Sequence, residues 1–159
     1  MAIGDSPWDL LHDLDDPNHL ERPAGFDVGE AIGRFRALQA EIERSFGCDC
    51  EVDVWPSVQD ASHLGRLTVP ASATETGERL VVVISNFSPL AVYALENPGV
   101  YDQAELDVLL GPADRERITS SFANCGYVAV QEEQLWQRYD GASPHLRQHT
   151  WWDRFFDYL

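Results

Sequence analysis

Residues 79–95 read RLVVVISNFSPLAVYAL, two apolar segments separated by a turn at Ser88-Pro89. Valine and isoleucine favour strands because their branched side chains pack well on a pleated surface. The continuous run from Val81 to Ile84 offers no polar residue to solvent on either face, so it predicts a central strand covered on both sides. We therefore expect two paired strands, over residues 79–87 and 90–95.

Two further strands are expected upstream of this pair. Residues 64–69 form an apolar segment that the polar loop 71–77 joins to the first strand of the pair. An earlier segment has a period of two, in which Cys48, Cys50, Val52 and Val54 alternate with Asp49, Glu51, Asp53 and Trp55. Successive side chains of a strand point to opposite faces, so this alternation predicts a half-buried strand that ends at Pro56.

Helical periodicity is clearest over residues 28–46. Asp27 precedes apolar residues at spacings of three and four, and Gly47 follows the last of them. This pattern predicts one long N-terminal helix packed on an antiparallel meander of about four to five strands, with residues 127–130 as the candidate fifth. Capping-box patterns at Asp102 and Thr150, and a proline at position 112, predict short C-terminal helices.

The fold class expected from this order is α+β, because a run of strands lies between helices instead of alternating with them. Residues 1–26 are expected to form an acidic N-terminal arm with a short helix opened by Ser6 and Pro7, and the acidic run 13–16 is predicted to be solvated. Residues 27–159 are expected to form a single α+β domain, since a chain of 159 residues can bury one substantial core.

Charge restricts the class of partner. The chain has 27 acidic and 11 basic residues, no lysine, and a formal net charge of -16. Such a field repels phosphate backbones and anionic lipids, which argues against nucleic-acid and membrane partners and favours a basic protein. Residues 1–16 have neither a basic start nor a continuous apolar run, and the three cysteines are an odd number, so we expect a cytoplasmic protein with reduced thiols.

No motif identifies a reaction or a cofactor. Phosphate-binding loops and the nucleophile elbow of hydrolases are absent from the sequence. The strongest metal candidate is His145, His149 and Asp153, which would share one face of a continuous helix, but a helix capped by Thr150 breaks that register. Cys48, Cys50 and Cys125 could in principle form a zinc site with His63, but the three cysteines are interpreted as core residues instead. We therefore assign no catalytic residue, metal site or cofactor.

The candidate partner-binding residues are acidic and aromatic. Residues two apart on a strand lie on one face about 7 Å from each other, so the 48–55 segment presents three carboxylates and an indole in a row. The final helix has two stripes, one formed by Trp152, Phe156 and Leu159 and the other by Trp151, Phe155 and Tyr158. A helix this short is not expected to bury both, which suggests an exposed stripe or a homodimer interface. The predicted binding residues are Asp49, Glu51, Asp53, Trp55 and Trp152, with a merely solvated strand face as the alternative.

Two stretches resemble known proteins. Residues 84–93, and residues 135–141 followed by 150–159, are similar to the strand-turn-strand and C-terminal aromatic patterns of small cytoplasmic immunity proteins in bacterial polymorphic and contact-dependent toxin systems. The resemblance implies a non-catalytic protein that binds and blocks a cognate toxin in the producing cell. The alternatives are a metal-dependent hydrolase that uses His145, His149 and Asp153, and a self-assembling structural or regulatory protein.

Overall fold

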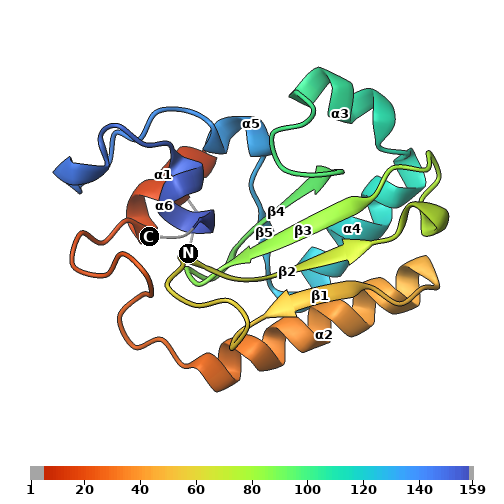
Figure 1. Cartoon of the computed structure of the whole chain (residues 1–159), viewed down its shortest axis with the longest axis horizontal. Coiled ribbons are helices and arrows are strands. Elements are labelled where there is room, and N and C mark those ends of the chain that lie inside the picture. Colours follow the sequence, from red (N-terminus) through yellow and green to blue (C-terminus); the bar gives the residue numbers. More distant parts are fainter. Residues whose placement is uncertain (1–5, 158–159) are drawn as a thin grey trace.

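The computed structural model describes residues 6–157 and shows an α+β fold built on one five-stranded sheet (Figure 1). The first half of the chain contains α1 (Pro7–Leu14), α2 (Val28–Phe46), β1 (Glu51–Val54), β2 (His63–Val69), the short 3-10 helix η1 (Ala71–Ala73), β3 (Leu80–Ser85) and β4 (Leu90–Leu95). The second half contains α3 (Gln103–Leu109), α4 (Pro112–Cys125), β5 (Val128–Ala129), α5 (Glu132–Leu135), the 3-10 helix η2 (Pro144–Leu146) and α6 (Trp151–Phe156).

The strand order in the sheet is β1-β2-β3-β4-β5, the order of the chain. The first four strands pair antiparallel, as the sequence predicts. β5 differs because it pairs parallel with β4, with Leu90 opposite Val128 and Ala91 opposite Ala129. The crossover through α3 and α4 returns the chain in the direction of β4, which a tight antiparallel turn cannot do.

The helix boundaries follow their caps. The Asp27 side chain accepts a hydrogen bond from the Glu30 amide, and Gly47 ends α2 in the left-handed conformation with φ of 65°. The capping boxes at Asp102 and Thr150 are both present. The expectation of one long N-terminal helix is wrong, because the short α1 comes first and the 19-residue α2 follows it. Within residues 6–157, no helix has both the length and the apolar character needed to cross a bilayer.

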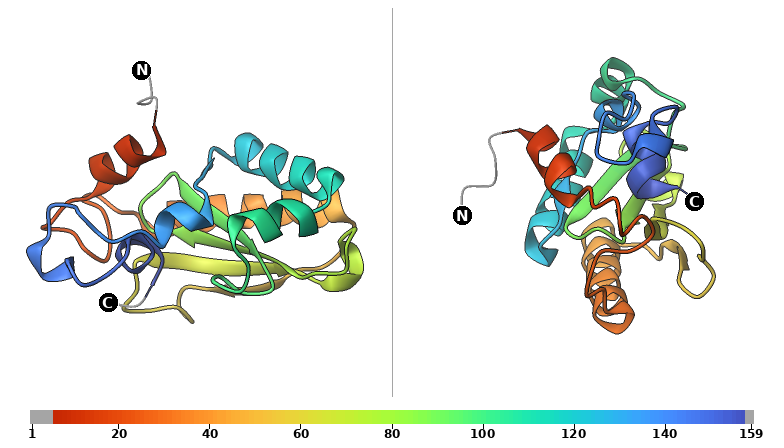
Figure 2. Two further views of the ribbon diagram at one scale, coloured as in Figure 1. Left: turned by 90° about the horizontal axis from the view of Figure 1, so that it is seen from above. Right: turned by 90° about the vertical axis from the view of Figure 1, so that its left-hand side faces the viewer.

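The sheet separates two apolar cores. On one face, Val82 and Ile84 of β3 pack with residues of α2, α3 and α4. On the other face, Val81 and Val83 pack with α6, the segments around it and Leu11 of α1. Every residue of β3 is buried, which confirms the predicted central strand. Figure 1 and the left view of Figure 2 show α1 and the C-terminal segments at the same end of the sheet.

The aromatic residues of α6 are all buried, while Asp153 of the same helix stays partly exposed. Trp151 and Trp152, one from each predicted stripe, are 0% and 5% exposed, and Phe155 and Phe156 are equally buried. The expectation that one stripe stays exposed is therefore wrong for these residues, because β3, α1 and residues 135–146 enclose the helix. Tyr158 and Leu159, which were expected on the same stripes, lie outside the described residues.

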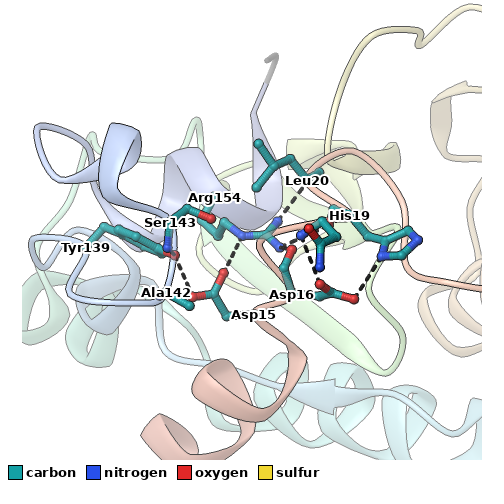
Figure 3. A network of polar contacts seen from close by, with 9 residues as sticks. Asp15, Asp16, His19, Leu20, Tyr139, Ala142, Ser143 and Arg154 are labelled. Carbon is teal, nitrogen blue, oxygen red and sulfur yellow. Dashed lines mark hydrogen bonds and ion pairs between the residues drawn. The ribbon is translucent and has the colours of Figure 1, made fainter.

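The N-terminal arm is tied to α6 by a buried polar network (Figure 3). The Nε atom of Arg154 lies 2.7 Å from Oδ1 of Asp15, and the other carboxylate oxygen of Asp15 accepts hydrogen bonds from the Tyr139 hydroxyl and the Ala142 amide. The remaining guanidinium nitrogens of Arg154 donate to backbone carbonyls of residues 16, 19 and 20. Asp15 is thus buried, which corrects the prediction of a solvated 13–16 run at this residue, whereas Asp13 is exposed.

Candidate functional site

The predicted acidic strand lies at an edge of the sheet. β1 is the first strand in the sheet order and pairs only with β2 among the described strands. Val52 and Val54 point towards the α2 core, so the alternate residues point to the opposite face. Asp49, Glu51, Asp53 and Trp55 are all exposed, and we call these four residues the acidic row.

The acidic row borders the part of the sheet face that the C-terminal segments leave open. The register places Glu51 opposite Thr68 and Asp53 opposite Arg66 on β2. On the far side of β2, Thr68 and Arg66 pair with Val81 and Val83 of β3, which α6 and the segments around it cover. The same face therefore changes from apolar and buried on β3 to charged and exposed on β1.

The carboxylates of the acidic row have no close counter-ion within residues 6–157. None of Asp49, Glu51 and Asp53 takes part in the ion pairs found there. Burial lowers the pKa of the neighbouring His63 below its usual 6.5, although the charge of Asp53 opposes this shift. His63 is therefore neutral near pH 7, and Arg66, opposite Asp53, is the base that faces the row.

Trp55 extends the acidic row beyond the end of β1. Its side chain is 36% exposed, and its amide donates a hydrogen bond to the Leu64 carbonyl, which fixes the backbone beside β2. A half-exposed indole next to carboxylates offers a large apolar contact area together with an N–H donor. Chemically, the row can attract a basic surface and then anchor it by aromatic contact.

Trp152 does not belong to this surface. Its ring is 5% exposed and stacks against Trp136, with the ring centroids 4.9 Å apart, so its assignment as a partner anchor is corrected. Trp136 is the accessible member of the pair, at 40% exposed. The pattern of aromatic stripes does not predict which of the two indoles is exposed. That depends on how residues 135–146 fold over α6 and cover Trp152.

The three residues of the metal alternative are not on one helix face. Asp153 is in α6, where its carboxylate accepts a hydrogen bond from the Thr150 amide, while His149 precedes the cap and His145 lies in η2. His149 Nδ1 is 3.4 Å from Asp153 Oδ2, an ion-pair distance. Across residues 6–157, no three His, Cys, Asp or Glu residues are grouped in a way that could hold a metal ion.

The cysteines lie partly buried against the α2 core and form no disulfide with one another. Burial raises the pKa of the Cys50 thiol to about 12, and the pKa values of Cys48 and Cys125 are raised for the same reason. Protonated thiols of this kind are poor nucleophiles at neutral pH. Their interpretation as core residues agrees with this placement.

The chain was compared with protein-family models, with curated proteins and with solved structures, and none of the three comparisons found a match.

Proposed function

We propose that the protein is a non-catalytic acidic binding module, and that it acts as an immunity protein that neutralises a cognate bacterial toxin in the cytoplasm by binding it. The observation that carries this proposal is the acidic row, three exposed carboxylates that have no close counter-ion among residues 6–157 and that end in an exposed indole. The resemblance of residues 84–93 and of the C-terminal aromatic segment to immunity proteins supports the biological role.

Electrostatics favours a basic protein as the partner. The net charge of -16 and the acidic row together attract a cationic surface, and such steering raises association rates by about 10- to 1000-fold at low salt. The same field opposes nucleic acid. An inhibitor that covers a basic cleft needs complementary charge and contact area, and it needs no reactive group of its own.

The position of the row on an edge strand has a second consequence. Charged residues on an edge strand also prevent sheets from pairing with each other, so exposure and charge alone are compatible with a protective role. The two roles differ in their effect on a foreign partner. Neutralising the row weakens partner binding if the surface is functional, whereas it promotes self-association if the charges are only protective.

A capture experiment separates these outcomes. The wild-type protein is immobilised, exposed at low salt to lysate of the host and of related strains, and eluted with a salt gradient. The row variant carries Asp49→Asn, Glu51→Gln and Asp53→Asn. A matched control carries Asp13→Asn, Glu116→Gln and Asp140→Asn, which removes three exposed charges elsewhere.

We expect the wild type and the control to retain the same basic protein and the row variant to lose it. Co-expression of the wild type, but not of the row variant, should relieve growth inhibition by the captured protein. Equal capture by the row variant and the control would remove the acidic row from the interface. A captured protein without toxicity would overturn the immunity role, and an increase in molar mass of the row variant would favour the protective role.

A further inference from the structure

Helices α3 and α5 both pack on β4 (Figure 1), and two adjacent cavities are lined by residues of these helices and of the segments that flank them. The first has a volume of about 240 Å³, and Tyr101, Asp102, Glu132, Glu133 and Trp136 are among the residues that line it. The second has a volume of about 210 Å³ and shares Gln103, Leu106 and Glu132 with the first. Glu132 therefore lies between the two cavities.

Glu132 is a buried carboxylate without a cation. Its side chain belongs to a residue that is 6% exposed, and its Oε1 atom accepts hydrogen bonds from the Gly99 amide and, at 3.0 Å, from Nε1 of Trp136. None of the ion pairs found within residues 6–157 includes it, and none of the described residues that line the first cavity is basic.

The other buried carboxylates of the described chain behave differently. Asp15 pairs with Arg154 at 2.7 Å, and Asp114 pairs with Arg117 at 2.9 Å. Ionised side chains are rarely buried unless they are paired, because the lost hydration must be replaced. Arg115, which lines the second cavity, is already engaged with Asp107 and Tyr93. Glu132 is therefore as buried as these two paired acids, but no cation lies beside it among the described residues.

The walls of the first cavity suit a cation. Trp136 is held in place by its stacking on Trp152 and by its hydrogen bond to Glu132, while Tyr101 contributes a second aromatic ring. Aromatic faces attract ammonium and guanidinium groups through their quadrupoles. Asp102 and Glu133 add negative charge at the exposed rim.

We propose that this cavity binds a guanidinium or alkylammonium group. The cation donates hydrogen bonds to the carboxylate of Glu132 and packs against the rings of Trp136 and Tyr101. An arginine side chain of another protein and a small free amine share this chemistry. The inference does not rest on the proposed function, because the acidic row lies on β1 at one edge of the sheet and this cavity is lined by residues of α3, α5 and the segments that flank them.

A titration of the ¹⁵N-labelled protein, followed by NMR, tests the proposal. The probes are agmatine, a small guanidinium amine, and N-acetyl-argininamide, which mimics an arginine in a chain. N-acetyl-citrullinamide is the neutral isostere. We expect the Trp136 indole N–H and the Gly99 amide to shift with at least one cationic probe, more weakly as salt rises, and to stay in place with the citrulline compound. Binding of agmatine alone would show that the site takes a free amine. Binding of both probes would show that it also accepts an arginine side chain of another protein.

The variant Glu132→Gln locates the site. It removes the charge and keeps an oxygen for the two N–H donors, so we expect binding to weaken by roughly tenfold or more. Glu116→Gln, which removes an exposed charge on α4, should bind as the wild type does. Equal shifts with arginine and citrulline compounds, or unchanged binding by Glu132→Gln, would overturn the proposal. Should Glu132→Gln fail to fold, the comparison of the two compounds on the wild type still decides it.

Discussion

Arg154 and Asp15 form an ion pair 2.7 Å long whose two side chains are 0% and 2% exposed. The central carbon of the guanidinium lies 4.6 Å from the ring centroids of both Phe87 and Phe155, which contact each other edge to face. It also donates to backbone carbonyls of the arm that follows α1. One cation therefore joins the N-terminal arm to the last described helix, and the arm depends on it for its position.

Replacement of Arg154 by methionine should destabilise the protein by about 3–5 kcal/mol, because it leaves Asp15 as a buried charge without its partner. Arg154→Lys should give a smaller loss, since an ammonium keeps the charge but cannot reach the same set of carbonyls. Urea unfolding followed by tryptophan fluorescence measures both changes.

The control for this prediction is the pair of Arg44 and Glu41 on α2, in which the Arg44 side chain is 71% exposed. Arg44→Met should leave the urea midpoint nearly unchanged, because solvent screens an ion pair whose cation is exposed. Equal midpoint shifts for Arg154→Met and Arg44→Met would show that the buried network does not stabilise the fold.

Local patterns were sufficient to predict most of the elements. The apolar run of β3, the alternation before Trp55 and the caps at Asp27 and Thr150 each depend on residues within a few positions of one another. The exposure of the acidic row followed from the same alternation. These features depend on the periodicity with which a helix or a strand directs its side chains to one face. A few consecutive residues are enough to recognise that periodicity.

Contacts between distant segments could not be predicted in this way. Arg154 and Asp15 are 139 positions apart, and nothing in either neighbourhood indicates the other. The burial of Trp152 depends on residues 135–146 folding over α6, and the parallel pairing of β5 involves only two register pairs. No pattern in the sequence singled out Glu132, whose hydrogen-bond partner Gly99 lies 33 positions upstream.

Gly65 is predicted to be required where β2 passes β1. A Cβ atom at this position would lie 2.8 Å from the Asp53 carbonyl oxygen and 3.0 Å from the Val54 side chain. Gly65→Ala should therefore displace the edge strand and destabilise the protein by about 1–3 kcal/mol. Thermal and urea unfolding would measure this loss.

Gly33, in the exposed middle of α2, provides the opposite case. A Cβ atom there has no neighbour within 4 Å, so Gly33→Ala should stabilise the protein by about 0.5–1 kcal/mol through helix propensity. A Gly65→Ala variant as stable as Gly33→Ala would contradict the close approach of the two strands.

His63 is predicted to make stability depend on pH below neutrality. Burial is the main cause that lowers its pKa in the folded protein, so between that lowered value and the usual 6.5 the unfolded chain binds more protons. The free energy of unfolding should then fall as pH decreases through this window. Above pH 6.5 the ring is neutral in both states, and its contribution to the pH dependence vanishes.

The comparison of wild type with His63→Gln isolates this contribution, because every other ionisable group is the same in the two proteins. We expect the urea midpoint of the wild type to decline more steeply between pH 7 and pH 5 than that of the variant. Parallel declines would show that His63 is not the group responsible.

The acidic row is predicted to cost stability instead of supplying it. Glu51 and Asp53 repel each other along one face of β1, Asp49 adds negative charge just before the strand, and of the three only Asp53 faces a base, Arg66, across the strands. Glu51→Gln should therefore raise the urea midpoint slightly at low salt, whereas Asp53→Asn should leave it unchanged or lower it. Both differences should shrink in 1 M NaCl, where the screening length is about 3 Å.

A large loss of stability from Glu51→Gln at either salt concentration would mean that the row holds the sheet edge together, and the exposed charges would then need no partner to explain them. A gain on neutralisation would instead mean that the fold tolerates a repulsive surface, which is the pattern expected where charge serves binding at the expense of stability.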